Sequence, residues 1–445
     1  MKKIFQYIML AVVTIVMASC TSDIEEPTAT TGKSNVQLVV GEFPAFGDSQ
    51  TRAIGTPDEG KTSWAEGDEL LLVIDNTFYG KQYATFTYND KSWKLTSGEL
   101  VYREGDPAYI PHVYYAPNYK WEAGKLVLKE GKDPGTDEYI EGNARITGNS
   151  ETITVSFAEA TRKYSRLRIA TLPNEQITVD TEYFTPAGSS DMEQEGNYTL
   201  TSDEKGNAYL YGTFENNSEV TVKYREAALT THTFSQATES AKSYALDATV
   251  ISANSAEEIK SAIEQKVADG KTTIRLNLAP NAGTDEFMAI REAIKGAAPN
   301  DEGTIELTII GVETIPEEAF KRMSQLKSVK MPDVKEIKKY AFSECQYLTV
   351  VEAPSLNKLN SGAFNECYLL SKLTFGPINY ADARYWQIFE DITPNIDLIL
   401  SDYQKEMIET DDNLYTANND IDYADSNKHW NKNFLGREFK SITCR

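Results

Sequence analysis

The chain has 445 residues, which is more than one ordinary hydrophobic core accommodates, so we expect several domains. Hydrophobic residues make up 40% of the chain and aromatic residues 11%, a composition that excludes a wholly disordered protein. The formal net charge is -23, and a field of this sign repels nucleic acid backbones and anionic lipid headgroups. We therefore expect no nucleic-acid partner.

Residues 1–20 have the pattern of a targeting segment. Lys2 and Lys3 precede an apolar run, Ile4 to Met17, that is too short for a comfortable transmembrane span. The segment ends Met17-Ala18-Ser19-Cys20, which resembles the lipobox of bacterial lipoproteins. This resemblance implies that the Cys20 thiol is acylated and becomes the new N-terminus, so that lipid alone attaches the protein to a membrane. The alternative is an ordinary signal peptide with an incidental cysteine.

An acidic run follows this cysteine. Asp23, Glu25 and Glu26 lie within six residues of it, which resembles the surface-export signal of Bacteroidetes lipoproteins. The resemblance implies an outer-membrane protein exposed on the cell surface. Residues 21–33 are polar and rich in Thr, Ser, Glu and Pro, which indicates a linker between lipid and fold.

Between residues 34 and 250 the sequence alternates short strand-like segments with turn residues. The segments are 36–40, 70–74, 83–88, 125–128, 153–157, 166–170, 208–211 and 220–224. Few stretches here show a helical period, and this pattern is typical of β-sandwiches. Since one sandwich takes roughly 100 residues, we expect two all-β sandwiches, over residues 34–148 and 149–250.

Three short motifs in the first of these domains carry a family resemblance. Thr51-Arg52, Trp64-Ala65-Glu66-Gly67-Asp68 and Tyr114-Tyr115-Ala116-Pro117 together resemble the fimbrillin-like (Mfa-like) surface lipoproteins of Bacteroidetes. The resemblance implies tandem β-sandwiches of the kind found in pilus subunits and their anchors. It also implies proteolytic processing after Arg52, which would remove the first strand. The alternative is that Arg52 is an exposed loop residue that is never cut.

A repeat of 22 residues dominates the sequence after residue 300. Ala319-Phe320, Ala341-Phe342 and Ala363-Phe364 recur at this interval, and further columns of apolar residues keep the same spacing. Units this small cannot bury their own apolar face, so they form a core by stacking into a solenoid. The unit resembles the BspA-type leucine-rich repeat, which implies short strands in a parallel sheet. Two longer helix–strand units, offset by 31 residues, precede the repeat. We therefore expect an α/β leucine-rich-repeat domain over residues 251–445.

The exposed face of this predicted sheet is the best candidate for ligand binding. If alternate residues of each strand point inward, the outward residues of successive strands form a column of Asn277, Thr308, Lys330, Glu352 and Thr374. Solenoids use such faces as extended binding surfaces. The column is polar and has no aromatic residue, which favours a protein partner over stacked sugars. The alternative is a merely soluble face.

No constellation of residues indicates catalysis, a metal or a cofactor, so we expect none. The histidines are His112, His232 and His429; no pair of them has metal-ligand spacing. The acidic stretch 411–425 lacks the spacing of a calcium loop, which favours a solvated loop.

Two further clusters have open interpretations. Cys345 and Cys367 share one repeat column, so a disulfide is conceivable, but Met323 in the same column favours two core thiols. The densest aromatic cluster contains Tyr109, Tyr114, Tyr115, Tyr119 and Trp121, and here core packing is favoured over glycan contact.

Together these patterns predict a non-catalytic, lipid-anchored cell-surface protein. We expect it to act as an adhesin or recognition protein that binds a host or neighbouring-cell protein through the repeat face. Two alternatives of other classes stay open. One is a fimbria-associated accessory or tip subunit, and the other is a glycan-binding surface module.

Overall fold

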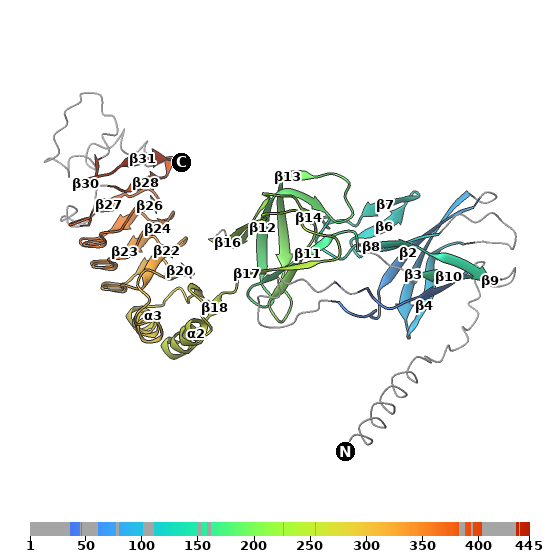
Figure 1. The fold of residues 1–445 in the computed structure, drawn as a ribbon, viewed down its shortest axis with the longest axis horizontal. Coiled ribbons are helices and arrows are strands. Elements are labelled where there is room, and N and C mark those ends of the chain that lie inside the picture. Colours follow the sequence, from blue (N-terminus) through green and yellow to red (C-terminus); the bar gives the residue numbers. More distant parts are fainter. Residues whose placement is uncertain are drawn as a thin grey trace, which may run out of the picture.

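The computed structural model describes residues 36–44, 46, 61–76, 80–100, 111–148, 153–157, 162–225, 227–253, 255–381, 388–392, 395–402, 433–435 and 437–445. Figure 1 shows three β-rich units that follow one another along the chain. The predictions for Cys20, Arg52, Tyr109, His429 and the acidic stretch 411–425 fall outside the described residues.

The first unit has a five-stranded antiparallel sheet in the order β4-β3-β2-β5-β8. Its strands are β2 (Glu69–Asn76), β3 (Gly80–Asn89), β4 (Ser92–Gly98), β5 (His112–Tyr115) and β8 (Ile140–Asn143). A three-stranded sheet in the order β1-β10-β9 contains β1 (Val36–Val40), β9 (Arg145–Gly148) and β10 (Ile153–Phe157). A separate hairpin joins β6 (Tyr119–Glu122) to β7 (Lys125–Leu128). Leu38 of β1 shares one buried cluster with Leu72 and Phe86, so the two sheets have a common core.

The Trp-x-x-Gly-Asp motif forms the entrance to β2. Gly67 has a φ of +87°, and the Asp68 carboxylate accepts a hydrogen bond of 2.7 Å from the Ala65 amide, which closes the turn. The Trp64 indole donates to the Gly41 carbonyl at 2.8 Å and packs edge-on against Tyr115 at 5.2 Å. The motif therefore ties the segment after β1 to the five-stranded sheet.

The boundary predicted at residue 148 is not where the first unit ends. Strand β10 lies beyond it, yet pairs in parallel with β1 and antiparallel with β9. The next sheet begins at Ser165. The prediction failed because the pairing of β10 with a strand at the start of the fold leaves no local signal in the sequence.

The second unit is one seven-stranded sheet in the order β16-β15-β12-β14-β11-β17, with β13 paired to β12. The strands are β11 (Ser165–Ala170), β12 (Gln176–Pro186), β13 (Glu193–Thr201), β14 (Asn207–Phe214), β15 (Glu219–Tyr224), β16 (Ala227–Thr233) and β17 (Ser243–Asp247). Val220, Val222 and Tyr224 are buried at alternate positions of β15, as the period of a strand requires.

A buried ion pair lies where the first two units meet. The Arg162 guanidinium pairs with the Glu138 carboxylate, and it also donates to the Pro44 carbonyl at 3.0 and 3.1 Å. Burial raises the pKa of Glu138 above its ordinary value, and the opposite charge of Arg162 opposes this shift. Phe46 packs with its ring 3.7 Å from the same guanidinium. The segment after β1 is thus held against the second unit.

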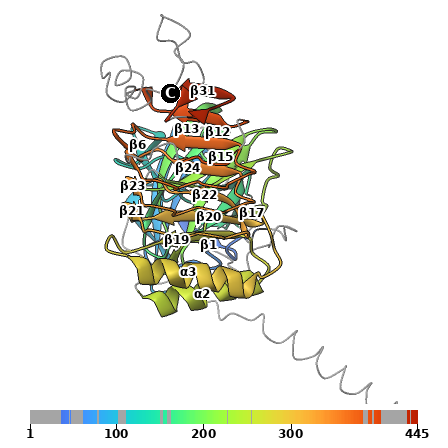
Figure 2. The ribbon, with the colours of Figure 1, turned by 90° about the vertical axis from the view of Figure 1, so that its left-hand side faces the viewer.

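The third unit, hereafter the repeat region, has an eight-stranded parallel sheet in the order β18-β19-β20-β22-β24-β26-β28-β31. The strands are β18 (Ile251–Ser252), β19 (Thr273–Asn277), β20 (Ile305–Ile310), β22 (Leu326–Lys330), β24 (Val350–Ala353), β26 (Lys372–Phe375), β28 (Asp397–Leu400) and β31 (Ser441–Cys444). Figure 2 shows these strands one above another, with both helices at one end.

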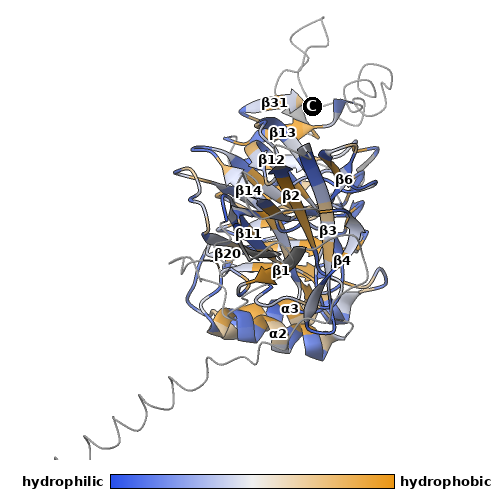
Figure 3. Cartoon of the chain, turned by 90° about the vertical axis from the view of Figure 1, so that its right-hand side faces the viewer, coloured by the Kyte–Doolittle hydropathy of each residue, from blue (hydrophilic) through white to orange (hydrophobic). Residues whose placement is uncertain are grey.

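Shorter elements complete the repeat region. A four-stranded parallel sheet contains β21 (Thr314–Ile315), β23 (Glu336–Ile337), β25 (Lys358–Leu359) and β27 (Tyr380–Ala381). A last hairpin pairs β29 (Asn433–Phe434) with β30 (Arg437–Glu438). Helix α2 (Ala256–Ala268) precedes β19 and helix α3 (Thr284–Ala297) precedes β20, and both carry apolar and polar residues in Figure 3. Their apolar faces bury Ile259, Ile263 and Phe287.

The repeated Ala-Phe pairs lie in the core, as the 22-residue spacing predicts. Phe320, Phe342 and Phe364 are buried in consecutive repeats, and their stacked rings are 5.2 and 5.5 Å apart. The strand register repeats with the same interval, since Val329 pairs with Val351. Each repeat therefore supplies one layer of a shared core.

Candidate functional site

The outward face of the eight-stranded sheet contains most of the residues predicted to bind a ligand. In β22, β24 and β26 the inward residues Val329, Val351 and Leu373 are fully buried. The residues that follow them point to the other side of the sheet: Lys330 is exposed, and Glu352 and Thr374 are half-buried. The structure thus brings these three predicted residues into one row across the sheet.

Strand β19 joins this row through a different residue from the one predicted. Arg275, not Asn277, lies beside Thr308, and Asn277 pairs with Ile310. The prediction put Asn277 beside Thr308 because the two helix–strand units are offset by 31 residues in the sequence. The sheet instead pairs β19 and β20 two residues out of that register, because backbone pairing and not the sequence interval sets the alignment of neighbouring strands.

The second unit covers the first part of the row. The Arg275 guanidinium donates to the Leu229 carbonyl of β16 at 2.7 Å, and both Arg275 and Thr308 are buried. Burial also lowers the pKa of Arg275. Ile310 belongs to the core cluster of the second unit. Thr308 is therefore covered and cannot belong to the binding face, and Asn277, although on the same side of the sheet, lies two residues from the row, beside the buried Ile310.

The open part of the face, hereafter the open row, consists of Lys330, Glu352 and Thr374 of one row and of Lys372, which pairs with Val350 in the row beside it. The Glu352 carboxylate lies between two ammonium groups, 3.5 Å from Lys330 and 3.4 Å from Lys372. These ion pairs are half-exposed, so they contribute little to stability. Half-buried apolar residues, Val350 of β24 and Ile399 of β28, border the row. The result is a polar surface with an alternating charge pattern and apolar edges, which suits a protein partner.

The two repeat cysteines are buried free thiols, which agrees with the interpretation that Met323 favoured. Burial raises the pKa of Cys345 to about 12 and that of Cys367 well above its ordinary value. A thiol with so high a pKa has almost no thiolate at neutral pH and is a poor nucleophile. These side chains therefore have a packing role.

The described histidines lie in different units and do not converge. The His112 ring contacts Asn143 at 2.9 Å and Glu141 at 3.3 Å, whereas the His232 ring packs against Phe234. Within the described ranges, no group of three or more His, Cys, Asp and Glu side chains could hold a metal ion. In the same ranges, no helix is long and apolar enough to cross a membrane.

The aromatic cluster packs mainly upon itself. Tyr115 and Tyr119 are buried, and burial raises the pKa of Tyr119 to about 12. Tyr114 and Trp121 are half-buried and meet edge-to-face at 5.9 Å against a small apolar cluster. The Trp121 indole nitrogen has no hydrogen-bond partner among the described residues. This mutual packing uses the ring faces that a sugar would need.

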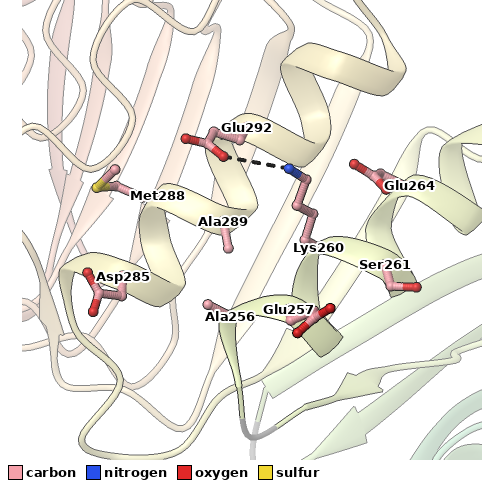
Figure 4. Close-up of a pocket in the computed structure, with 9 residues that line it drawn as sticks. All are labelled: Ala256, Glu257, Lys260, Ser261, Glu264, Asp285, Met288, Ala289 and Glu292. Carbon is pink, nitrogen blue, oxygen red and sulfur yellow. Dashed lines mark ion pairs between the residues drawn. The ribbon is translucent and has the colours of Figure 1, made fainter.

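Sequence reasoning missed a shallow groove between α2 and α3 (Figure 4). The two helices were predicted, but the groove depends on how their outer faces come together. One signal in the sequence could have pointed to it: Met288 stands on the polar side of α3, at a position where the 3.6-residue period expects a polar residue.

Residues 304–402 match the family model of the BspA type leucine rich repeat region, in six copies. The repeat region is similar to these repeats, which confirms the predicted resemblance of the 22-residue unit. The match covers less than half of the chain and does not extend into the first two units.

No curated protein matches the chain. Among solved structures, a candidate cell adhesion protein from Bacteroides fragilis is 10% identical, with a TM-score of 0.27, over 49% of this chain and 93% of that one. The minor pilin of Streptococcus agalactiae is 12% identical, with a TM-score of 0.18, over 48% of this chain and 93% of that one. Both TM-scores are below 0.5, so neither similarity supports a conclusion about fold or function.

Proposed function

We propose that this protein is a non-catalytic cell-surface adhesin or recognition protein that binds a protein partner through the open row. In this proposal Cys20 carries the lipid anchor at the outer membrane, two fimbrillin-like β-sandwiches form the first two units, and the repeat region is a leucine-rich-repeat solenoid. The observation that carries the proposal is the Lys330–Glu352–Lys372 series with its apolar borders, on a sheet face that is open beyond β20. Such faces are the usual binding surfaces of stacked repeats.

The partner is expected to be a folded protein rather than a sugar or a nucleic acid. The open row offers alternating charges and no aromatic platform, which fits polar contacts with a complementary surface. The net charge of -23 disfavours polyanions. Half-buried Val350 and Ile399 supply the apolar contacts that stable recognition also needs.

The test is binding of the full mature chain to immobilised extracellular-matrix proteins and to surface-protein extracts of host and bacterial cells. Glu352→Lys places a third positive charge between Lys330 and Lys372, so affinity for the captured partner should fall about tenfold or more, or about 1.4 kcal/mol. Glu336→Lys is the matched control. Glu336 is also half-buried and pairs with Lys358 at 2.9 Å, but it lies on the four-stranded sheet.

Equal losses of affinity in Glu352→Lys and Glu336→Lys would show that total charge, and not the open row, governs binding. Unchanged binding in Glu352→Lys would place the binding surface elsewhere and overturn the proposal.

The alternative of a fimbria-associated subunit depends on processing at Arg52. Mass spectrometry of the mature surface protein distinguishes the fimbrial role from the adhesin role. A chain that begins after residue 52 and co-purifies with pili favours the fimbrial role. An intact N-terminal segment on a protein that still binds its partner favours the adhesin.

A further inference from the structure

A groove of about 550 Å³ runs between the outer faces of α2 and α3, at the end of the repeat region opposite β31. Figure 4 shows that residues of both helices face it. It lies on a different surface from the open row and does not depend on the function proposed above.

Small side chains account for the shape of the groove. Ala256 and Ser261 of α2 and Ala289 of α3 line it, so neither helix fills the space between the two backbones. Met288 stands at its edge with 43% of its surface exposed. Methionine adapts its shape and is suited to contact an apolar partner side chain. The groove is thus shallow, and its apolar surface comes from the two alanines and Met288.

The rim of the groove has a strong excess of negative charge. Among the described residues that line it, the only charged groups are one ammonium, that of Lys260, and four carboxylates, those of Glu257, Glu264, Asp285 and Glu292. The Lys260 ammonium is 3.7 Å from Glu292, and both side chains are about half exposed. A single exposed lysine does not balance this field, so the groove attracts positive charge.

The geometry of the groove restricts what can occupy it. Helix α2 has 13 residues, which corresponds to a length of about 20 Å. A helix offers no free backbone groups along its sides, so an added β-strand would gain no hydrogen bonds there. A third helix can lay its ridges between two others, at about 8–10 Å from each axis. A second copy of this chain is disfavoured because its net charge is -23.

We propose that the α2–α3 groove binds a basic amphipathic helix of another protein. Its apolar side chains would lie over Ala256, Ala289 and Met288, and its lysines or arginines would reach Glu257 and Glu292. A polar outer surface is needed at the end of any repeat array. That need explains charged residues on these helices, and the first-turn positions of Glu257 and Asp285 suit the helix dipoles, but neither accounts for Glu264 and Glu292 beside an exposed methionine.

The test uses the full mature chain with ¹³C-labelled methionine methyl groups and a synthetic helical peptide of Lys, Leu and Ala, about 18 residues long. The Met288 methyl resonance should shift in a saturable manner. Met192 is the internal control, because it is 48% exposed and lies beside Asp191 and Glu193 on the second unit. The same peptide with Glu in place of Lys should leave Met288 unchanged.

Charge variants complete the test. The double variant Glu257→Lys/Glu292→Lys should weaken the binding of the basic peptide about tenfold or more, because both helices lose their anchor for positive charge. The control double variant Glu195→Lys/Glu219→Lys lies on the second unit and changes the net charge of the chain by the same amount. It should change the affinity for the basic peptide less than twofold. Equal shifts of Met288 and Met192, or equal effects of the two double variants, would overturn the proposal. A Met288 resonance that does not move with the basic peptide would do so as well.

Discussion

His112 lies at the start of β5, where two polar side chains of β8 contact its ring. Its ring contacts the Asn143 amide oxygen and the Glu141 carboxylate, and Glu141 also pairs with Lys163. The hydrogen bond to Glu141 raises the pKa of His112, and the same bond is the first cause of a lowered pKa at Glu141. Protonated imidazole donates from both nitrogens, so it satisfies both oxygen acceptors at once.

These shifts predict a pH-dependent contribution to stability. The folded-state pKa of His112 lies above its ordinary value of about 6.5, so the interaction is complete below that pH and is lost as the pH rises through the folded-state pKa. Glu141 stays ionised throughout this range because its pKa is lowered. His112→Gln should therefore cost more free energy of unfolding at about pH 5.5 than at about pH 8.5. We expect a difference of a few tenths to about 1 kcal/mol, because the ring is partly exposed.

The measurement is the denaturant midpoint of the native protein and of the His112→Gln variant at both pH values. In a Glu141→Gln background the pH dependence of the His112→Gln cost should disappear. If His112→Gln lowered the free energy of unfolding equally at both pH values in the native background, the pairing of protonated His112 with Glu141 would be contradicted.

At the scale of the element, the repeat uses cysteine to connect adjacent turns. The Cys345 thiol donates to the Phe320 carbonyl at 3.0 Å, and the Cys367 thiol donates to the Phe342 carbonyl at 3.1 Å. Each acceptor belongs to the preceding Ala-Phe pair. Cysteine suits this place because it is small, largely apolar and still a weak donor. Met323, in the first copy, fills the same column.

This arrangement predicts slow thiol chemistry in the folded repeat region. With a pKa of about 12, Cys345 has a thiolate fraction of only about 10⁻⁴ at pH 8. An alkylating reagent should therefore modify Cys345 and Cys367 only after unfolding, as mapped by mass spectrometry. Half-buried Cys444 of β31 should react earlier and serves as the internal reference. Rapid modification of Cys345 in the native protein, or a disulfide between the two repeat cysteines, would contradict this role.

At the scale of the whole molecule, each unit is fixed to the next by buried contacts. The ion pair of Arg162 and Glu138 lies between the first and second units. Between the second unit and the repeat region, Arg275 donates to β16, and Ile310 enters the core of the second unit. The outward face of β19 and β20 is thereby covered by the second unit.

This second joint predicts that the repeat region and the second unit stabilise one another. Ile310→Ala should cost about 2–4 kcal/mol, because it opens a cavity in a fully buried site shared by two units. Hydrogen exchange should become faster in both β16 and β20. The control, Ile399→Ala, changes a half-buried residue near the other end of the same sheet and should cost much less. Faster exchange in β20 alone would show that the two units are not coupled through Ile310.

The amino-acid sequence alone determined the features that depend on short-range periodicity. The strand segments in the first two units follow from alternation and turn residues, and strands lie at each of them. The burial of Phe320, Phe342 and Phe364 follows from the 22-residue interval, because identical units can share a core only when their apolar columns stack.

Only the tertiary structure decided which segments far apart in the chain touch. The partner of β10, the alignment of Arg275 with Thr308, and the covering of that pair by β16 all depend on such contacts. Shifting a strand by two residues keeps its inward and outward sides unchanged, so the pattern of apolar residues cannot detect it. For the same physical reason the sequence could nominate a binding face, while the packing of whole units determined how much of that face is open.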